Sequence, residues 1–373
     1  MRRLLIAVVV IAFACTGSAH AAVPTLDAKA FYVVNASNGD VIAASNAHAR
    51  LPIASITKLM TVIVALDHLK PNDTVTVSGY AAQVGESRIP LVRGQRISVR
   101  ELLAGALIQS ANNAADALAS AASGGNLAEF VGWMNDRGRK LGLRDTHFVR
   151  PDGLDAPGHV SSARDVAMLA RVAMHLPIVR ELVRKRSEPI ERGNFVTRTW
   201  NDLLGVFPGL IGVKTGHTND AGWCEVAAAR RGGFTIYAVI LGSPTRSQRN
   251  FDLQRLLAWG VSQYRTLTLV APQPYAWAAA PYGRPALALV ATKTLVRAVR
   301  VGRPLVERIV APTSVSLPVT RGERLGRVEV WSGRTRLGSR PLLAGRTITR
   351  PGLGGRVRWY GTRTVHHLLG LFS

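Results

Sequence analysis

Cysteine is almost absent from this chain of 373 residues, which contains only Cys15 and Cys224. We expect Cys15 to leave with an N-terminal leader, so the mature protein would keep one cysteine and form no internal disulfide. Cys224 lies in an apolar stretch, where a small buried core residue is expected. No spacing of cysteine and histidine is typical of a metal site, and we expect neither a metal nor a cofactor.

Acidic residues are also scarce, because 23 Asp and Glu stand against 47 Lys and Arg, which gives a net charge of +24. The imbalance is greatest from Arg265 onward, where 18 basic residues face 3 Glu. Such a charge favours anionic lipids or anionic wall polymers as partners of an exported protein. Nucleic acid is the usual alternative partner, but no segment resembles a nucleic-acid-binding motif, so we expect none.

The apolar run at the start of the chain is too short to span a membrane. It covers residues 4–14, follows two arginines and precedes the small-residue pattern Ala19-His20-Ala21, which together predict a secretory signal peptide cut after Ala21. A retained membrane anchor and a lipoprotein at Cys15 are weaker alternatives. We therefore expect an exported protein on the periplasmic or cell-surface side of the cytoplasmic membrane.

Composition and turn residues divide the chain into four parts. The segments are a signal peptide (1–21), a main domain (22–264), a small β domain (265–350) and a basic amphipathic segment (351–373). In the main domain we expect a hairpin over 31–43, helices over 101–122, 130–141, 163–176 and 249–264, and strands over 210–214, 223–229 and 234–241.

One short motif organises the main domain, the pattern Ser55-x-x-Lys58 at the start of an apolar helix. A helix would place both side chains on one face, three residues apart. A lysine amine can take the serine proton only if it is neutral, and burial or a second nearby cation lowers its pKa. The simpler interpretation is an ordinary serine and lysine on a helix surface.

Two further motifs follow. The first, Ser110-Ala111-Asn112, interrupts the apolar helix over 101–122. Polar residues there indicate either a plain helix-to-helix turn or side chains directed at a site. The second, Lys214-Thr215-Gly216, stands at the end of a predicted strand.

In this order the three motifs resemble the penicillin-recognising serine enzymes. Two longer strings, Lys214-Thr215-Gly216-His217-Thr218 and residues 142–148, resemble the serine-type D-Ala-D-Ala carboxypeptidases, the low-molecular-mass penicillin-binding proteins. The resemblance covers roughly residues 28–264. It implies an α+β fold: a β-lactamase/transpeptidase-like antiparallel sheet flanked by helices, with a helical subdomain and a small C-terminal all-β domain.

The resemblance also implies a reaction, the removal of the terminal D-alanine from peptidoglycan pentapeptide stems, with β-lactam antibiotics as inhibitors. Ser55 would attack the carbonyl carbon, Lys58 would act as the base, and Ser110 would relay a proton to the leaving amine. The substrate would be bound by Asn112, Lys214, Thr215, Gly216, the backbone N–H of His217, which shares the oxyanion hole with that of Ser55, and Arg249.

The chain also departs from its relatives. Asp152 stands where certain relatives have a histidine, so no role is given to it. No counterpart of the deacylating glutamate of class A β-lactamases is present in the loop 151–162, which disfavours efficient β-lactam hydrolysis. Two alternatives to the carboxypeptidase remain: an endopeptidase that cuts D-amino-acid crosslinks, and a non-catalytic wall-binding protein.

The residue pattern of the C-terminal segment predicts that this segment makes a peripheral contact with a membrane. In a helix, Trp359, Val365, Leu368, Leu369 and Phe372 would gather on one side, with Arg356 and Arg363 toward the other. A frayed basic tail is the alternative interpretation, because Gly361 and Gly370 are poor helix residues.

Overall fold

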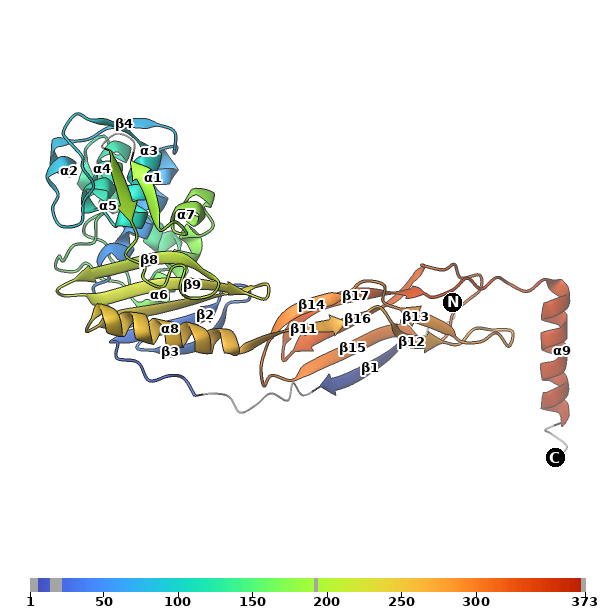
Figure 1. The fold of residues 1–373 in the computed structure, drawn as a ribbon. Helices are drawn as coiled ribbons and strands as arrows, with labels where there is room; N and C mark the ends of the chain where they lie inside the picture. The colour runs from blue at the N-terminus through green and yellow to red at the C-terminus, as the bar shows by residue number, and fades with distance from the viewer. Residues whose placement is uncertain (1–5, 14–21, 191–193, 370–373) are drawn as a thin grey trace. The chain divides into compact units, whose positions relative to one another are not determined.

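The computed structural model describes the backbone of residues 6–13, 22–190 and 194–369. The chain divides into two compact units between Gln263 and Tyr264, and each is described by itself (Figure 1). We call them the N-terminal unit and the C-terminal unit. Residues 6–13 fall in the C-terminal unit, and the four-part division made from the sequence stays a prediction.

A five-stranded antiparallel sheet forms the centre of the N-terminal unit (Figure 1). In spatial order its strands are β3 (Asp40–Ser45), β2 (Ala30–Asn35), β10 (Phe234–Ser243), β9 (Gly222–Arg231) and β8 (Leu210–Thr218). The predicted hairpin and the three predicted late strands are confirmed, and together they make this sheet. Strand β8 lies at one edge, so the side of it that faces away from β9 is open to a ligand.

Two helices pack on the sheet, α6 (Ala163–Ala173) and α8 (Arg246–Ser262). A Cβ added at Gly260 of α8 would lie 3.3 Å from the side chain of Ile236 in β10. The next strand residue, Tyr237, faces Arg171 of α6 instead. Because neighbouring strand residues point to opposite faces, the two helices cover opposite faces of the sheet.

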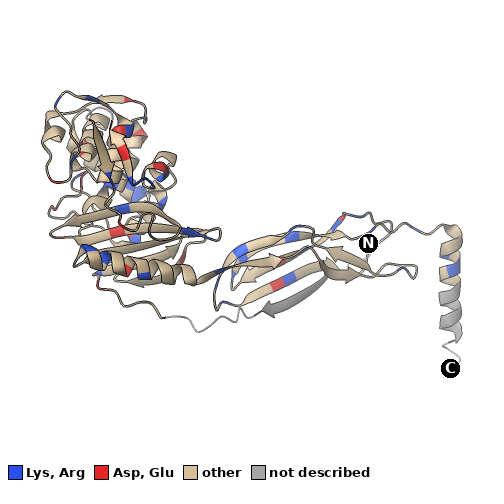
Figure 2. Ribbon diagram, viewed as in Figure 1, with Lys and Arg blue, Asp and Glu red and all other residues tan. Residues whose placement is uncertain are grey.

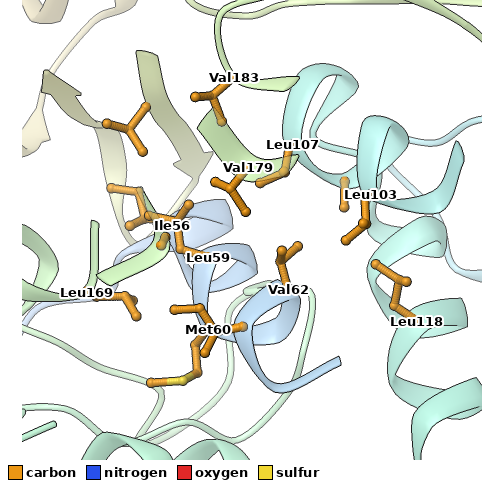
Figure 3. Close-up of a cluster of buried hydrophobic side chains, with 14 of the residues drawn as sticks. Ile56, Leu59, Met60, Val62, Leu103, Leu107, Leu118, Leu169, Val179 and Val183 are labelled. Carbon is orange, nitrogen blue, oxygen red and sulfur yellow. The ribbon is translucent and has the colours of Figure 1, made fainter. Parts of the chain in front are cut away.

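The remaining helices form a layer around α1 (Lys58–His68), whose residues from Lys58 to Ala65 are all buried. Apolar side chains from several elements close around this helix, among them Leu59, Val62 and Leu103 (Figure 3). The other elements of this layer are α2 (Gly79–Gln83), α3 (Val99–Ala104), α4 (Asn112–Ala122), α5 (Leu127–Lys140) and α7 (Pro177–Leu182).

Two short hairpins complete the unit, one from β4 (Thr74–Thr76) and β5 (Arg96–Ser98), the other from β6 (Ser187–Ile190) and β7 (Phe195–Arg198). The second hairpin and the helix α7 were not predicted. Strands of three or four residues with half-exposed polar side chains carry too little hydrophobic alternation to be recognised in a sequence.

The C-terminal unit is all β apart from its last helix, as predicted, and the predicted fold class is thereby confirmed. Its main sheet has the order β1-β15-β16-β17-β13-β12, and β11 pairs with β14. The strands are β1 (Ile6–Phe13), β11 (Tyr264–Val270), β12 (Pro274–Ala278), β13 (Leu287–Val290), β14 (Leu295–Arg300), β15 (Leu305–Pro312), β16 (Arg324–Ser332) and β17 (Thr335–Ala344).

Strand β1 comes from the segment that the sequence predicts to be a signal peptide. Its backbone pairs antiparallel with β15 from Ile6↔Pro312 to Phe13↔Leu305. Cleavage after Ala21 remains a prediction, and Cys15 lies outside the described residues. Cleavage would remove β1 and leave β15 at the edge of the sheet.

The C-terminal segment forms the helix α9 (Leu353–Leu369). Three exposed side chains, Leu353, Val357 and Tyr360, stand at the spacing of one helix face. Trp359 contacts Tyr282, with ring centroids 5.3 Å apart, and the ring of Tyr360 lies 6.3 Å from that of Tyr282. The side chains expected beyond them, Arg363, Val365, Leu368, Leu369 and Phe372, lie outside the described residues. Over the described ranges, no helix combines the length and hydropathy that a membrane crossing requires.

Candidate active site

Ser55 lies on a 3-10 turn, Ala54–Thr57, that leads directly into α1. The sequence predicts a helix here, and the structure shows this tighter turn, with Ala54 at a positive φ of 48°. A Cβ on Gly153 would lie 2.2 Å from the Ala54 carbonyl oxygen, and one on Gly216 would lie 2.8 Å from that of Ile53. Two glycines therefore let a loop and the edge strand β8 close tightly around the nucleophile turn.

Lys58 is fully buried, and its Nζ has three partners. It lies 2.7 Å from Ser55 Oγ, 2.7 Å from Asn112 Oδ1 and 2.6 Å from the carbonyl oxygen of Asp152. The last two atoms can only accept hydrogen bonds. A neutral amine has two N–H groups and one lone pair, so with both N–H groups donated to these oxygens the lone pair points at the Ser55 hydroxyl.

Burial lowers the pKa of Lys58 to about 8, although the carboxylates of Asp152 and Asp116 work against the shift. The sequence analysis expected a second cation to contribute, but burial is the main cause. The pKa of Lys214 falls well below its usual value, first through burial and then through the charge of Lys58. Both lysines therefore lie where the neutral amine is favoured far more than in water.

A buried histidine holds the loop after α5 against α1. His159 Nδ1 accepts the backbone N–H of Val149 at 3.0 Å, so its proton is on Nε2, which donates to Thr57 Oγ1 at 2.8 Å. Thr61 Oγ1 donates to the Pro151 carbonyl at 2.5 Å. Burial lowers the pKa of His159 to about 4, so the ring stays neutral near pH 7. These contacts place the Asp152 carbonyl over Lys58.

The second motif breaks the helical run as the sequence predicts. A π-helical turn, Gly105–Gln109, ends at Ser110, whose φ of 63° is left-handed, and α4 begins at Asn112. The break turns the Ser110 hydroxyl toward Lys214, whose Nζ donates to it at 2.7 Å. It also brings Asn112 to Lys58. Both side chains are thus directed at buried lysines of the candidate site.

Arg249 is buried at the same pocket, only 1% exposed, above the ring of Trp223 at 5.6 Å. Its Nε lies 3.2 Å from the Glu225 carboxylate and its Nη2 3.3 Å from that of Asp202. Burial raises the pKa of Glu225 to about 7. Glu225 is therefore only partly ionised near pH 7, and Asp202 is the partner of Arg249 that remains a carboxylate.

Asp152, to which the sequence analysis gives no role, is fully buried beside Lys58. Arg150 donates to it from Nε at 2.5 Å and from Nη2 at 2.7 Å, and the backbone N–H of Leu154 donates at 3.0 Å. Burial opposes its ionisation, but these bonds and the nearby Lys58 lower the pKa of Asp152 below its usual value. It is therefore a carboxylate at neutral pH.

A second buried carboxyl, Asp116, lies one helical turn after Asn112 on α4 and faces Asp152. Among the described residues, no side-chain or backbone N–H donates to either of its oxygens. Two adjoining buried carboxyls cannot both be ionised cheaply, and burial together with Asp152 raises the pKa of Asp116 to about 8. The pair therefore holds one proton near pH 7, and Asp116 carries it.

These groups open on a pocket of about 200 Å³. It brings together seven residues predicted for the site, Ser55, Ser110, Asn112, Thr215, Gly216, His217 and Arg249, with Lys58 and Lys214 buried behind them. Sequence reasoning missed five further lining residues: Glu86, Ser87, Leu154, Trp200 and Trp223. They come from loops and strand ends, and no local pattern marks them. Trp223 could have been found, because strand alternation places it beside His217, and their rings lie 4.1 Å apart.

Comparison with known proteins finds one matching family and several similar proteins. The profile of a family described as D-alanyl-D-alanine carboxypeptidase matches residues 17–245. D-alanyl-D-alanine carboxypeptidase DacF of Bacillus subtilis is 35% identical over 249 residues, which are 64% of this chain and 64% of that protein. DacC of Escherichia coli is 36% identical over 264 residues, 67% of this chain and 65% of that protein. The chain thus matches somewhat less than two thirds of the length of these curated relatives.

Solved structures agree in fold. Penicillin-binding protein 5 from Haemophilus influenzae superposes with a TM-score of 0.65 at 26% identity, covering 88% of this chain and 99% of that one. Penicillin-binding protein D2 from Listeria monocytogenes, solved in its ampicillin-bound form, has a TM-score of 0.58 at 32% identity, covering 63% of this chain and 98% of that one.

Proposed function

The chain belongs to the D-alanyl-D-alanine carboxypeptidase family, and from this premise we propose that it removes the terminal D-alanine from peptidoglycan stem peptides. The single observation that carries the proposal is the hydrogen bonding of Lys58. When the amine is neutral, its two acceptor-only partners leave the lone pair for the Ser55 hydroxyl, 2.7 Å away. That geometry makes Ser55 an activated nucleophile.

In the proposed reaction Ser55 Oγ attacks the carbonyl carbon of the penultimate D-alanine while its proton moves to Lys58. Strand β8 runs past the turn closely enough that a Cβ on Gly216 would lie 3.1 Å from the Ser55 nitrogen. This supports an oxyanion hole made by the backbone N–H groups of Ser55 and His217. The C–N bond then breaks, which leaves an ester on Ser55 and releases D-alanine.

Ser110 is placed to return a proton to the leaving amine. Its hydroxyl accepts a hydrogen bond from Lys214 Nζ, so its own O–H is free to turn toward the substrate. Ser110 takes in exchange the proton that Lys58 received from Ser55, so Lys58 is neutral again. Water then hydrolyses the ester, with Lys58 as the base. Ser55, Lys58 and Ser110 are thus the proposed catalytic residues.

The substrate carboxylate fits the cationic side of the pocket. Thr215 offers a hydroxyl there, Arg249 a buried guanidinium and Lys214 a buried amine. An approaching carboxylate would raise the pKa of Lys214, so the lysine would take up a proton and become positively charged. Binding of the carboxylate and protonation of Lys214 would therefore favour each other. Asn112 is held by Lys58 and by the Gly85 carbonyl at 3.1 Å, and it lines the pocket beside the peptide.

The experiment offers the full chain three substrates: a soluble pentapeptide stem ending in D-Ala-D-Ala, the same peptide with an amidated C-terminus, and a crosslinked muropeptide dimer. We expect the protein to release D-alanine from the first peptide and to release much less from the second. The amidated C-terminus carries no negative charge for the cationic side of the pocket to bind. Faster cleavage of the dimer would support the endopeptidase alternative, and no cleavage of any substrate by folded protein would support the non-catalytic one.

We further propose that the protein acts outside the cytoplasmic membrane and that β-lactams inhibit it. We also propose that α9 makes a peripheral contact with the membrane. The exposed Leu353, Val357 and Tyr360 support an apolar face on that helix. Arg356 and Arg358 would meet anionic head groups beside it.

A further inference from the structure

A second hollow lies on the N-terminal unit and shares no residue with the pocket around Ser55. It encloses about 350 Å³ between the end of α6, the helix α7 and the starts of β8 and β10. Four arginines and a histidine line it, and none of its lining residues is acidic. They are Arg171, Arg180, Arg184, Arg230 and His175.

The sheet register separates the two sites. Arg230 pairs with Thr235 at one end of the sheet, whereas Trp223, which lines the pocket, pairs with His217 toward the other end. Arg230 follows Trp223 by seven positions along strand β9, which corresponds to roughly 23 Å. An anion in the hollow would therefore not be the peptide bound beside Ser55.

Among the residues that the structure describes, the arginines of the hollow have no acidic partner. Some other arginines of this unit are paired with carboxylates, as Arg150 is with Asp152 and Arg246 with Asp202. Within the described ranges, no carboxylate lies in ion-pair distance of any of the four arginines here. Four like charges around one hollow repel each other, and an anion among them would relieve that repulsion.

Two of the basic side chains, Arg180 and His175, are also held in place. Arg180 Nη1 donates to the carbonyl oxygens of Met174 and His175, both at 2.8 Å, which fixes the guanidinium at the end of α6. His175 Nδ1 donates to the Arg171 carbonyl at 2.7 Å. The buried Tyr237 adds a phenol, and burial raises its pKa to about 12, so it remains a hydroxyl donor at neutral pH. Fixed donors lower the entropic cost of binding.

We infer that this hollow binds a phosphate ester. A guanidinium group can donate two parallel N–H hydrogen bonds to the oxygens of a phosphate. The four arginines carry more positive charge than a single carboxylate ligand would neutralise. The volume suits a phosphate with the glycerol or sugar that carries it. Both a phosphodiester wall polymer and a phospholipid head group present this chemistry. Basic residues occur along both units (Figure 2), so the test must separate this hollow from overall charge.

The test uses the full chain with two double variants that remove equal charge. Arg184→Ser with Arg230→Ser empties one side of the hollow. The control, Arg231→Ser with Arg93→Ser, removes two exposed arginines elsewhere, and Arg231 is the strand neighbour of Arg230 on the opposite sheet face. Binding of inorganic phosphate and of a soluble glycerol-phosphate oligomer is measured by calorimetry, and binding of phosphatidylglycerol vesicles by co-sedimentation.

We expect the hollow variant to weaken binding of at least one probe about tenfold or more, and the control variant to weaken it less than twofold. Loss of oligomer binding identifies a wall polymer as the source of the phosphate, and loss of vesicle binding alone identifies a lipid. Equal weakening by both variants, or no binding of any probe by the wild type, overturns the inference. Release of D-alanine from a soluble peptide should be unchanged in both variants, which keeps this result independent of the proposed reaction.

Discussion

The two units differ most in what they bury. The N-terminal unit buries Lys58, Lys214 and Arg249 together with the carboxyls of Asp116 and Asp152 at or beside one pocket, and it buries Asp165 and Asp252 elsewhere. In the described part of the C-terminal unit, Glu329 is the only charged side chain that is buried, and its carboxylate is paired with Arg327 at 2.8 Å. A buried charge destabilises a fold unless it is paired. Several buried charged groups gathered at one pocket therefore indicate that the pocket serves a reaction, because they do not stabilise the fold.

The C-terminal unit shows the opposite organisation. Its core is a continuous apolar cluster that includes Leu289, Val328 and Leu342. Its surplus of basic residues is on the surface, where solvent and salt screen it. On this comparison the N-terminal unit should carry the whole reaction, and changes in the C-terminal unit should alter where the protein is found and leave its turnover unchanged.

The largest effect should come from Lys58. We predict that Lys58→Arg lowers the rate of Ser55 acylation as severely as Lys58→Ala, by roughly 10²–10⁴-fold, because arginine keeps the charge but cannot accept a proton near pH 7. Acylation rates with a chromogenic β-lactam would measure this. An arginine variant close to the wild-type rate would mean that Lys58 acts through its charge and that the lone-pair geometry is irrelevant.

A smaller effect should come from substitution of Asp116, and it should appear in the pH dependence of acylation. Acylation should rise as Lys58 loses its proton, around pH 8. An ionised Asp116 raises the pKa of Lys58, so Asp116→Asn should move the midpoint of this rise to lower pH, without abolishing activity. The control is Asp136→Asn, an exposed carboxylate that pairs with Arg139. A midpoint equal to that of the wild type would contradict an electrostatic coupling between Asp116 and the base.

The same substitution should change the stability of the unit. The pKa of Asp116 is raised in the folded state from 3.8 to about 8, so the folded chain binds the extra proton between these values. Its contribution to stability is complete below pH 4 and is lost as the pH rises through about 8. Asparagine cannot ionise, so the Tm of Asp116→Asn relative to wild type should increase from pH 4 to pH 8. A constant Tm difference across this range would show that Asp116 is ionised throughout.

The smallest effect on turnover should come from the C-terminal unit. We predict that a chain ending at Arg350, without α9, releases D-alanine from a soluble peptide at the wild-type rate. It should lose the salt-resistant part of its binding to anionic vesicles, because insertion of apolar side chains is not screened by salt whereas attraction of arginines is. Co-sedimentation at low and high salt measures this. Equal sedimentation of both chains at high salt would rule out α9 as the membrane contact.

The sequence predicts most of the fold and the principal site residues because those depend on local signals. Strand alternation marks β8 to β10, and the break at Ser110 stands out in a helical run. Asp116 could not be recognised in the same way, since its partner Asp152 is 36 positions away and only the packed loop brings them together. The hollow was missed for a similar reason, because its arginines come from two helices, the turn after α7 and a strand.

The central claim is that Ser55, activated by Lys58, forms a covalent acyl-enzyme. It is tested most directly by incubating the full chain with penicillin and measuring its intact mass, followed by peptide mapping, with Ser55→Ala as the matched control. The account predicts one penicillin adduct per chain, on the peptide that contains Ser55, lasting minutes or longer, and no adduct on the alanine variant while its Tm is unchanged. An adduct on another residue, or none on folded wild-type protein, would contradict it.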